Sequence, residues 1–118
     1  MLEFYSIDDS KNEVHYMSSY ERHCDTFIFE DKSAENTKVS LTIGTVARIK
    51  REGNVTMDFW FDKNNVTQGF YENNMGLSVM FTIKTKELYL KDNMFFLSYN
   101  LYIDGDKMSE HLIKIKFF

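Results

Sequence analysis

The 118-residue sequence contains no proline, a single cysteine (Cys24) and five glycines. One cysteine cannot form a disulfide within the chain, and it cannot build a cysteine-rich zinc site. The glycines form no GxGxxG or GxxxxGK loop of the kind that binds phosphates. The missing proline is typical of a chain made mostly of β-ladder, in which every backbone N–H is needed as a donor.

Long hydrophobic runs and an excess of basic residues are also missing. The longest apolar run, Met94-Phe95-Phe96-Leu97, is too short for a membrane-spanning helix. The N-terminal residues 1–5 show no secretory pattern, so we expect a cytoplasmic protein without a membrane partner. The net charge of −4 argues against a nucleic-acid partner, because such partners usually require a basic surface.

Aromatic residues, by contrast, are abundant and make up 16% of the chain. Each Phe or Tyr buries roughly 150–250 Å² of surface, so a chain of this length has enough apolar material for a core. Single cores commonly extend over about 50–200 residues. We therefore expect one domain that comprises residues 1–118.

Apolar and polar residues alternate with a period of two in one segment after another, which is typical of half-buried β-strands. The clearest segments are 39–43, 55–62, 77–84, 95–103 and 111–117. Weaker strands are predicted near 2–7, 14–20, 26–30, 45–50, 68–73 and 88–90. No segment shows a sustained helical spacing of apolar residues, so we expect little or no helix. Eight to ten such strands joined by short turns predict a single antiparallel up-and-down β-barrel.

The alternation also predicts the register of two hairpins, because apolar residues should share one face across a strand pair. Pairing Ile49 with Val55 leaves residues 51–53 as a three-residue loop, with Gly53 in the left-handed conformation. Pairing Leu101 with His111 places the second turn around residues 105–107. A two-residue turn at Gly105-Asp106 is rejected, because it would place Glu110 opposite Leu101.

The inward faces of these strands indicate a small ligand site. They carry the bulky residues Met57, Phe59, Phe61, Phe81, Phe95, Tyr99 and Phe117. A barrel of about eight strands is just wide enough for side chains or one small ligand. The strong inward strands show no Arg or Lys, which a carboxylate ligand would need. His111 falls on an inward face and could bind a ligand or shuttle a proton. We therefore predict a site for a small apolar ligand at Tyr99, His111, Phe59 and Phe81. The alternative is a structural histidine near the barrel mouth, hydrogen-bonded to the backbone or to a tyrosine.

The outward faces carry a second set of aromatic residues, namely Trp60, Phe96 and Tyr102. They could form a surface for stacking bases or sugars. Asp58 and Asp62 flank Trp60 on the same face, however, and they disfavour a phosphate backbone. A covered outer face or a contact with a protein partner is the favoured interpretation.

No group of residues indicates catalysis or a bound metal. His15, His23, Cys24 and Asp25 are the only candidate ligand cluster, and neighbouring residues of a strand point to opposite faces. No paired carboxylates, nucleophile–base spacing or cofactor loop is present. We therefore expect no metal site, no cofactor and no enzymatic activity.

Several short motifs in the middle and at the end of the chain occur in a characteristic order. The run Arg51-Glu52-Gly53-Asn54-Val55-Thr56-Met57 resembles the R-x-G-x-V-x-M hairpin of the YwiB-like family. The resemblance continues over residues 26–118, through these positions: Thr67, Gly69, Tyr71, Gly76, Met80, Thr85, Leu88, Tyr99–Ile103, His111 and Ile113–Ile115. This family consists of small bacterial barrels of unknown function with a calycin-like (lipocalin-like) shape. The resemblance implies that fold and a bacterial cytoplasmic setting, but no catalytic residues.

Two functions from different classes follow from these features. The first is non-enzymatic binding of a small apolar molecule in the barrel or at its mouth. The second is a protein-interaction or assembly module, in which a filled barrel serves as a scaffold for a protein partner or a homodimer. The outward aromatic residues support the second function. So does the acidic segment 1–36, which holds nine acidic and three basic residues.

Overall fold

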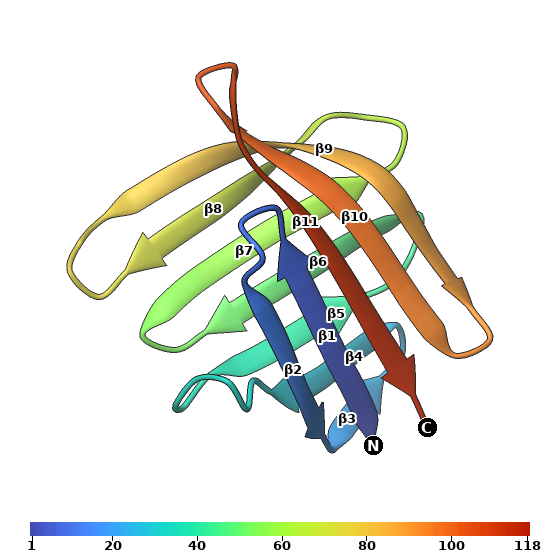
Figure 1. The fold of residues 1–118 in the computed structure, drawn as a ribbon. Helices are drawn as coiled ribbons and strands as arrows, with labels where there is room; N and C mark the ends of the chain where they lie inside the picture. Colours follow the sequence, from blue (N-terminus) through green and yellow to red (C-terminus); the bar gives the residue numbers. More distant parts are fainter.

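The computed structural model describes all 118 residues, which form eleven β-strands and no helix (Figure 1). The strands are β1 (Leu2–Asp8), β2 (Glu13–Ser18), β3 (Tyr20–His23), β4 (Thr26–Glu30), β5 (Lys38–Thr42), β6 (Val46–Glu52), β7 (Val55–Asp62), β8 (Thr67–Asn73), β9 (Ser78–Lys91), β10 (Met94–Ile103) and β11 (Asp106–Phe117). Every paired neighbour is antiparallel, so the predicted fold class is confirmed. No helix has the length and hydrophobicity needed to cross a membrane.

The strands form one sheet that curls into a nearly closed barrel (Figure 1). Its order runs from β3 through β11 along the chain, and β1 then pairs with β11 and β2 with β1. The two edge strands, β2 and β3, are successive parts of one segment that is interrupted at Ser19. Because β2 pairs with β1 and β3 pairs with β4, this kinked segment links the two ends of the sheet. Counted as one strand, it brings the total to ten.

The core lies inside the barrel and follows the predicted alternation. Burial alternates residue by residue along β10, so that Phe95, Leu97, Tyr99 and Leu101 face inward. The aromatic rings pack against one another across the interior, as where the Phe61 and Tyr99 ring centroids lie 4.7 Å apart. Such rings supply most of the apolar area that stabilises a small domain.

The β6–β7 hairpin has a different register from the predicted one. Ile49 pairs with Phe59, not with Val55, and Arg51 belongs to the strand and pairs with Met57. The shift by an even number of residues keeps every side chain on its predicted face. Gly53 does not adopt the left-handed conformation. A Cβ atom at this position would lie 2.5 Å from Thr37 Oγ1, so the glycine is needed for close packing against the β4–β5 loop.

The β10–β11 hairpin also differs from the prediction. Tyr99 pairs with His111, whereas the alternation predicted Leu101 as the partner. The turn is the two-residue pair Asp104-Gly105, and both residues have positive φ, of 51° and 85°. This is the geometry of the Asp-Gly hairpin turn. A β-bulge next to Leu101 shifts the register by one residue, so that inward residues pair with inward residues along the rest of the hairpin. The two-residue turn therefore agrees with the alternation of apolar residues in both strands.

Gly69 in β8 allows two core side chains to approach the sheet. A Cβ atom there would lie 2.6 Å from Phe59 Cδ1 and 2.8 Å from Ile83 Cδ1. We expect Gly69→Ala to lower the free energy of unfolding by about 1–2 kcal/mol, because the added methyl overpacks the core. Urea denaturation measures this loss. Gly44→Ala is the control, since the nearest atom there is an ordinary contact at 3.4 Å. Equal urea midpoints for the two variants would contradict the prediction.

Candidate functional site

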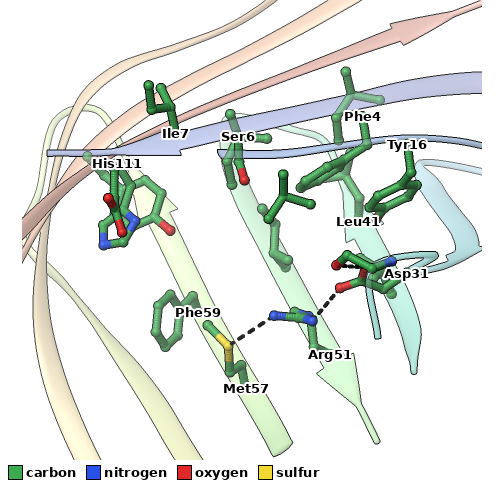
Figure 2. A pocket seen from close by; sticks show the side chains of 18 of the residues that line it. Phe4, Ser6, Ile7, Tyr16, Asp31, Leu41, Arg51, Met57, Phe59 and His111 are labelled. Carbon is green, nitrogen blue, oxygen red and sulfur yellow. Dashed lines mark hydrogen bonds and ion pairs between the residues drawn. The ribbon is translucent and has the colours of Figure 1, made fainter. Parts of the chain in front are cut away.

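A cavity of about 330 Å³ lies inside the barrel (Figure 2). Strands β1, β2, β4, β5, β6, β7, β10 and β11 contribute its walls, and 15 of its 22 lining residues are hydrophobic. The exposed lining residues Asn12 and Ser33 mark its mouth, between the β1–β2 loop and the β4–β5 loop. Ligand pockets commonly measure about 300–1,000 Å³, so this cavity has room for a small molecule.

The structure brings together three of the four residues predicted to contact a ligand. Tyr99, His111 and Phe59 all line the cavity, whereas Phe81 does not. Phe81 packs behind Phe59, with its ring edge-on at a centroid distance of 5.8 Å. No residue of β8 or β9 lines the cavity, so it occupies only one part of the barrel interior.

His111 lies at one pole of the cavity, between Tyr99 on β10 and Asp8 on β1. Its ring is stacked on that of Tyr99, with centroids 5.0 Å apart and planes at 15°. His111 Nε2 is hydrogen-bonded to Ser109 Oγ at 2.7 Å. Burial lowers the pKa of His111, because desolvation disfavours the charged ring, and nearby Asp8 and Asp9 oppose this shift only in part. The imidazole is therefore neutral at pH 7.

This lowered pKa predicts a pH dependence of stability. As the pH falls below about 6.5, the unfolded chain takes up a proton at residue 111 before the folded protein does. The free energy of unfolding therefore decreases from that pH down to the lower pKa of the folded state. We expect the wild type to lose more stability between pH 7.5 and pH 5.5 than His111→Gln does. Chemical denaturation at both pH values measures the difference, and equal losses would contradict the assignment.

A charged pair lies at the second pole of the cavity, and its cation comes from β6, which is not one of the strong inward strands predicted to lack Arg and Lys. Arg51 lines the cavity and its Nη2 donates to Asp31 Oδ2 (Figure 2). Asp31 Oδ1 in turn accepts hydrogen bonds from the Ser33 backbone N at 2.9 Å and from Ser33 Oγ. The side chain of Asp31 is only 7% exposed. Arg51 continues the inward series of Ala47 and Ile49 by one step, a signal that the predicted loop at residues 51–53 conceals.

Two donors near this pair have no hydrogen-bond partner. They are the Tyr16 hydroxyl and Arg51 Nε, both of which are buried. The only contact of Arg51 Nη1 with an acceptor is with Met57 Sδ, at 3.9 Å, and a thioether is a weak acceptor. Burial raises the pKa of Tyr16, so its hydroxyl keeps its proton. The Asp31 pole is therefore rich in unused donors.

The outward aromatic residues do not form one continuous surface. Trp60 on β7 is 43% exposed and lies under the guanidinium of Arg48, 4.6 Å from the ring centroid. Phe96 on β10 is stacked on Tyr89, and Tyr102 lies near Lys84. Strands β8 and β9 separate β7 from β10 in the sheet. Because neighbouring strands are about 4.8 Å apart, Trp60 is far from the other two residues.

Arg48 also forms an ion pair beside Trp60. Its Nε and Nη2 donate to the two carboxylate oxygens of Asp58, at 2.8 and 2.6 Å. These hydrogen bonds hold the pKa of Asp58 below its usual range. On the outer face, the guanidinium of Arg48 therefore contacts both the Asp58 carboxylate and the Trp60 ring.

The residues considered as metal ligands do not converge on one point in the structure. His15 Nε2 contacts Glu3 at 2.9 Å, and His23 Nε2 contacts Glu21 at 3.4 Å. Cys24 is exposed in the turn between β3 and β4. The structure groups no three His, Cys, Asp or Glu side chains as ligands for one metal ion.

Comparisons with known proteins relate the chain to one family and one solved fold. The family described as "Domain of unknown function (DUF1934)" matches residues 7–115. The crystal structure of the ywiB protein from Bacillus subtilis is similar, with a TM-score of 0.67 and 16% sequence identity. The likeness covers 99% of this chain and 89% of that chain. No curated protein matches the sequence. At this identity, the structural likeness extends to the fold alone.

Proposed function

The chain belongs to the DUF1934 family of domains of unknown function, as the YwiB-like motifs predicted, and we propose that it binds a small, mostly apolar molecule in its barrel. The observation that supports this proposal is the cavity of about 330 Å³ with largely hydrophobic walls. Binding is proposed to be non-covalent and non-enzymatic. The protein would then hold or carry its ligand without changing it.

The energetic argument concerns the walls of the cavity. Phe4, Phe29 and Leu41 are among the side chains that face the empty space. An apolar ligand that packs against these side chains removes their surface and its own from water, which contributes roughly 25 cal/mol per Å². An apolar cavity of about 150 Å³ is already large enough to bind benzene, so a larger one can hold a longer molecule.

Filling the cavity with a side chain tests this proposal. Ser6 lies on the inward face of β1, lines the cavity and is paired with Val14 and Ile113 (Figure 2). We expect Ser6→Phe to weaken the binding of ethylbenzene at least about tenfold, because the new ring occupies the ligand's place. NMR titration of the labelled protein measures the affinity.

The matched control is Ser40→Phe, which places the same ring on β5 between the inward residues Val39 and Leu41, and so on the outer face. This variant should bind ethylbenzene as the wild type does. Native mass spectrometry of protein purified from cells adds a second measurement, since a bound natural ligand appears as extra mass. If the wild type binds no apolar probe and carries no extra mass, the proposed function is wrong.

A protein-interaction role is the second candidate. It is supported by the stack of Tyr89 and Phe96 on the outer face, whose ring centroids are 5.1 Å apart at an angle of 15°. Tyr89 is 47% exposed, so this stack presents apolar surface to a partner or a second copy. Light scattering of the wild type, Phe96→Ala and Trp60→Ala tests self-association. A monomer at all concentrations removes the homodimer from consideration, and a pull-down then tests other partners.

A further inference from the structure

We propose that the cavity selects neutral ligands that carry a hydrogen-bond acceptor, such as a ketone or ester carbonyl, and that Arg51 and Tyr16 bind this acceptor. The inference rests on the proposed function and specifies the ligand's chemical class. It assigns the polar end of the ligand to the Asp31 pole and its apolar body to the hydrophobic walls.

The first step of the argument concerns the donors at this pole. Arg51 Nε and the Tyr16 hydroxyl have no partner, and Arg51 Nη1 has only the thioether of Met57. Unsatisfied buried donors are costly, so native proteins rarely keep them without a reason. Both side chains line the cavity, and a ligand acceptor that displaces the weak Met57 contact restores a normal hydrogen bond.

The second step concerns the acceptors at the same pole. Asp31 Oδ1 accepts two hydrogen bonds from Ser33, and Asp31 Oδ2 accepts one from Arg51. The carboxylate therefore already accepts three hydrogen bonds, which leaves about one of its four lone-pair sites. A ligand that offers donors, such as an ammonium group with three N–H bonds, has too few acceptors here. The complementary ligand group is an acceptor.

The third step concerns charge. The positive charge of Arg51 is already compensated by Asp31, because the two groups are hydrogen-bonded. A ligand carboxylate would place a second negative charge on the same guanidinium inside a largely apolar cavity. Desolvating that charge is costly unless a free cation receives it. A neutral oxygen gains the same hydrogen bonds without this cost.

The His111 pole offers fewer free groups that could bind the ligand's oxygen. His111 Nε2 is already hydrogen-bonded to Ser109, and one face of the ring is covered by Tyr99. The unused donors are concentrated at the Asp31 pole, so we assign the ligand's oxygen to that end.

Three probes with eight carbon atoms test the selection: ethylbenzene, acetophenone and phenylacetate. They differ in having no acceptor, a neutral acceptor and a charged acceptor. We expect acetophenone to bind the wild type at least about tenfold more tightly than either of the others, as one good hydrogen bond to a charged donor allows. NMR titrations at pH 7.5 give the three affinities, and shifts at residues 16 and 51 locate the oxygen.

Two variants separate the contributions of the pole. Tyr16→Phe removes one unused donor and should reduce the preference for acetophenone over ethylbenzene severalfold. Asp31→Asn removes the compensating charge, so phenylacetate should bind this variant at least about tenfold more tightly than it binds the wild type. Tyr16→Phe keeps the test valid if Asp31→Asn fails to fold.

The outcomes distinguish the inference from the proposed function. If ethylbenzene and acetophenone bind equally tightly, the cavity binds ligands but the selection by Arg51 and Tyr16 is wrong. If phenylacetate binds the wild type most tightly, the ligand is an anion and the charge argument is overturned. If none of the three probes binds, the proposed function and the inference both fail.

Discussion

Replacing Phe61 by alanine is expected to lower the free energy of unfolding by about 3–5 kcal/mol. Phe61 is completely buried and is paired with Ala47, whose methyl group is too small to fill the space. Its ring lies 4.7 Å from that of Tyr99 and 6.3 Å from that of Phe59. The truncation would join the existing cavity, and a barrel wall held by its ladder cannot collapse to close the gap.

Guanidinium denaturation measures this loss, and Phe118→Ala is the matched control. Phe118 is 64% exposed at the C-terminus, so its truncation should change the free energy of unfolding by no more than about 0.5 kcal/mol. A further consequence concerns binding, because the enlarged cavity should accept longer probes than the wild type does. If Phe61→Ala costs no more than Phe118→Ala, the interior around β7 is not packed as described.

Arg51→Met is expected to cost about 3 kcal/mol of stability. It removes the only cation bonded to Asp31, whose side chain is 7% exposed, and so leaves a buried carboxylate unpaired. Breaking such a pair commonly costs about 3–5 kcal/mol, and the lower end applies because the side chain of Arg51 is still 32% exposed. Methionine preserves most of the length and apolar stem of the arginine, so the loss reports the charge.

The double variant Arg51→Met/Asp31→Asn tests whether the unpaired carboxylate causes this loss of stability. Replacing both members removes the unpaired charge, so it should recover more than half of the stability that the single variant loses. Urea denaturation of the wild type, the two single variants and the double variant completes the cycle. Additive losses would show that the two side chains are not coupled, which would contradict the hydrogen bond between them.

The candidate site was predictable from the sequence only in part. The alternation along 95–103 and 111–117 placed Tyr99 and His111 on inward faces, and in the structure they stack at one pole of the cavity. The predicted loop at residues 51–53 excludes Arg51 from the strand, so the second pole is absent from the predicted site. Its partner Asp31 lies in the segment between β4 and β5, where no periodicity exists to indicate its direction.

The register of the hairpins shows the physical limit of the alternation. A period of two determines which face a side chain occupies, but any shift by an even number of residues preserves that face. Ile49 therefore faces inward whether it pairs with Val55 or with Phe59. The choice depends on contacts that the pattern does not contain, such as the packing of Gly53 against Thr37.

The sequence by itself determined the all-β class, the low helix content, most strand positions and the division of the aromatic residues between the two faces. These properties are local, because each follows from the alternation of neighbouring residues. The tertiary structure decided the closure of the barrel through the kink at Ser19, the cavity and the pairing of Arg51 with Asp31. These properties are not local, because each depends on which distant strands come together and how much space their side chains leave between them.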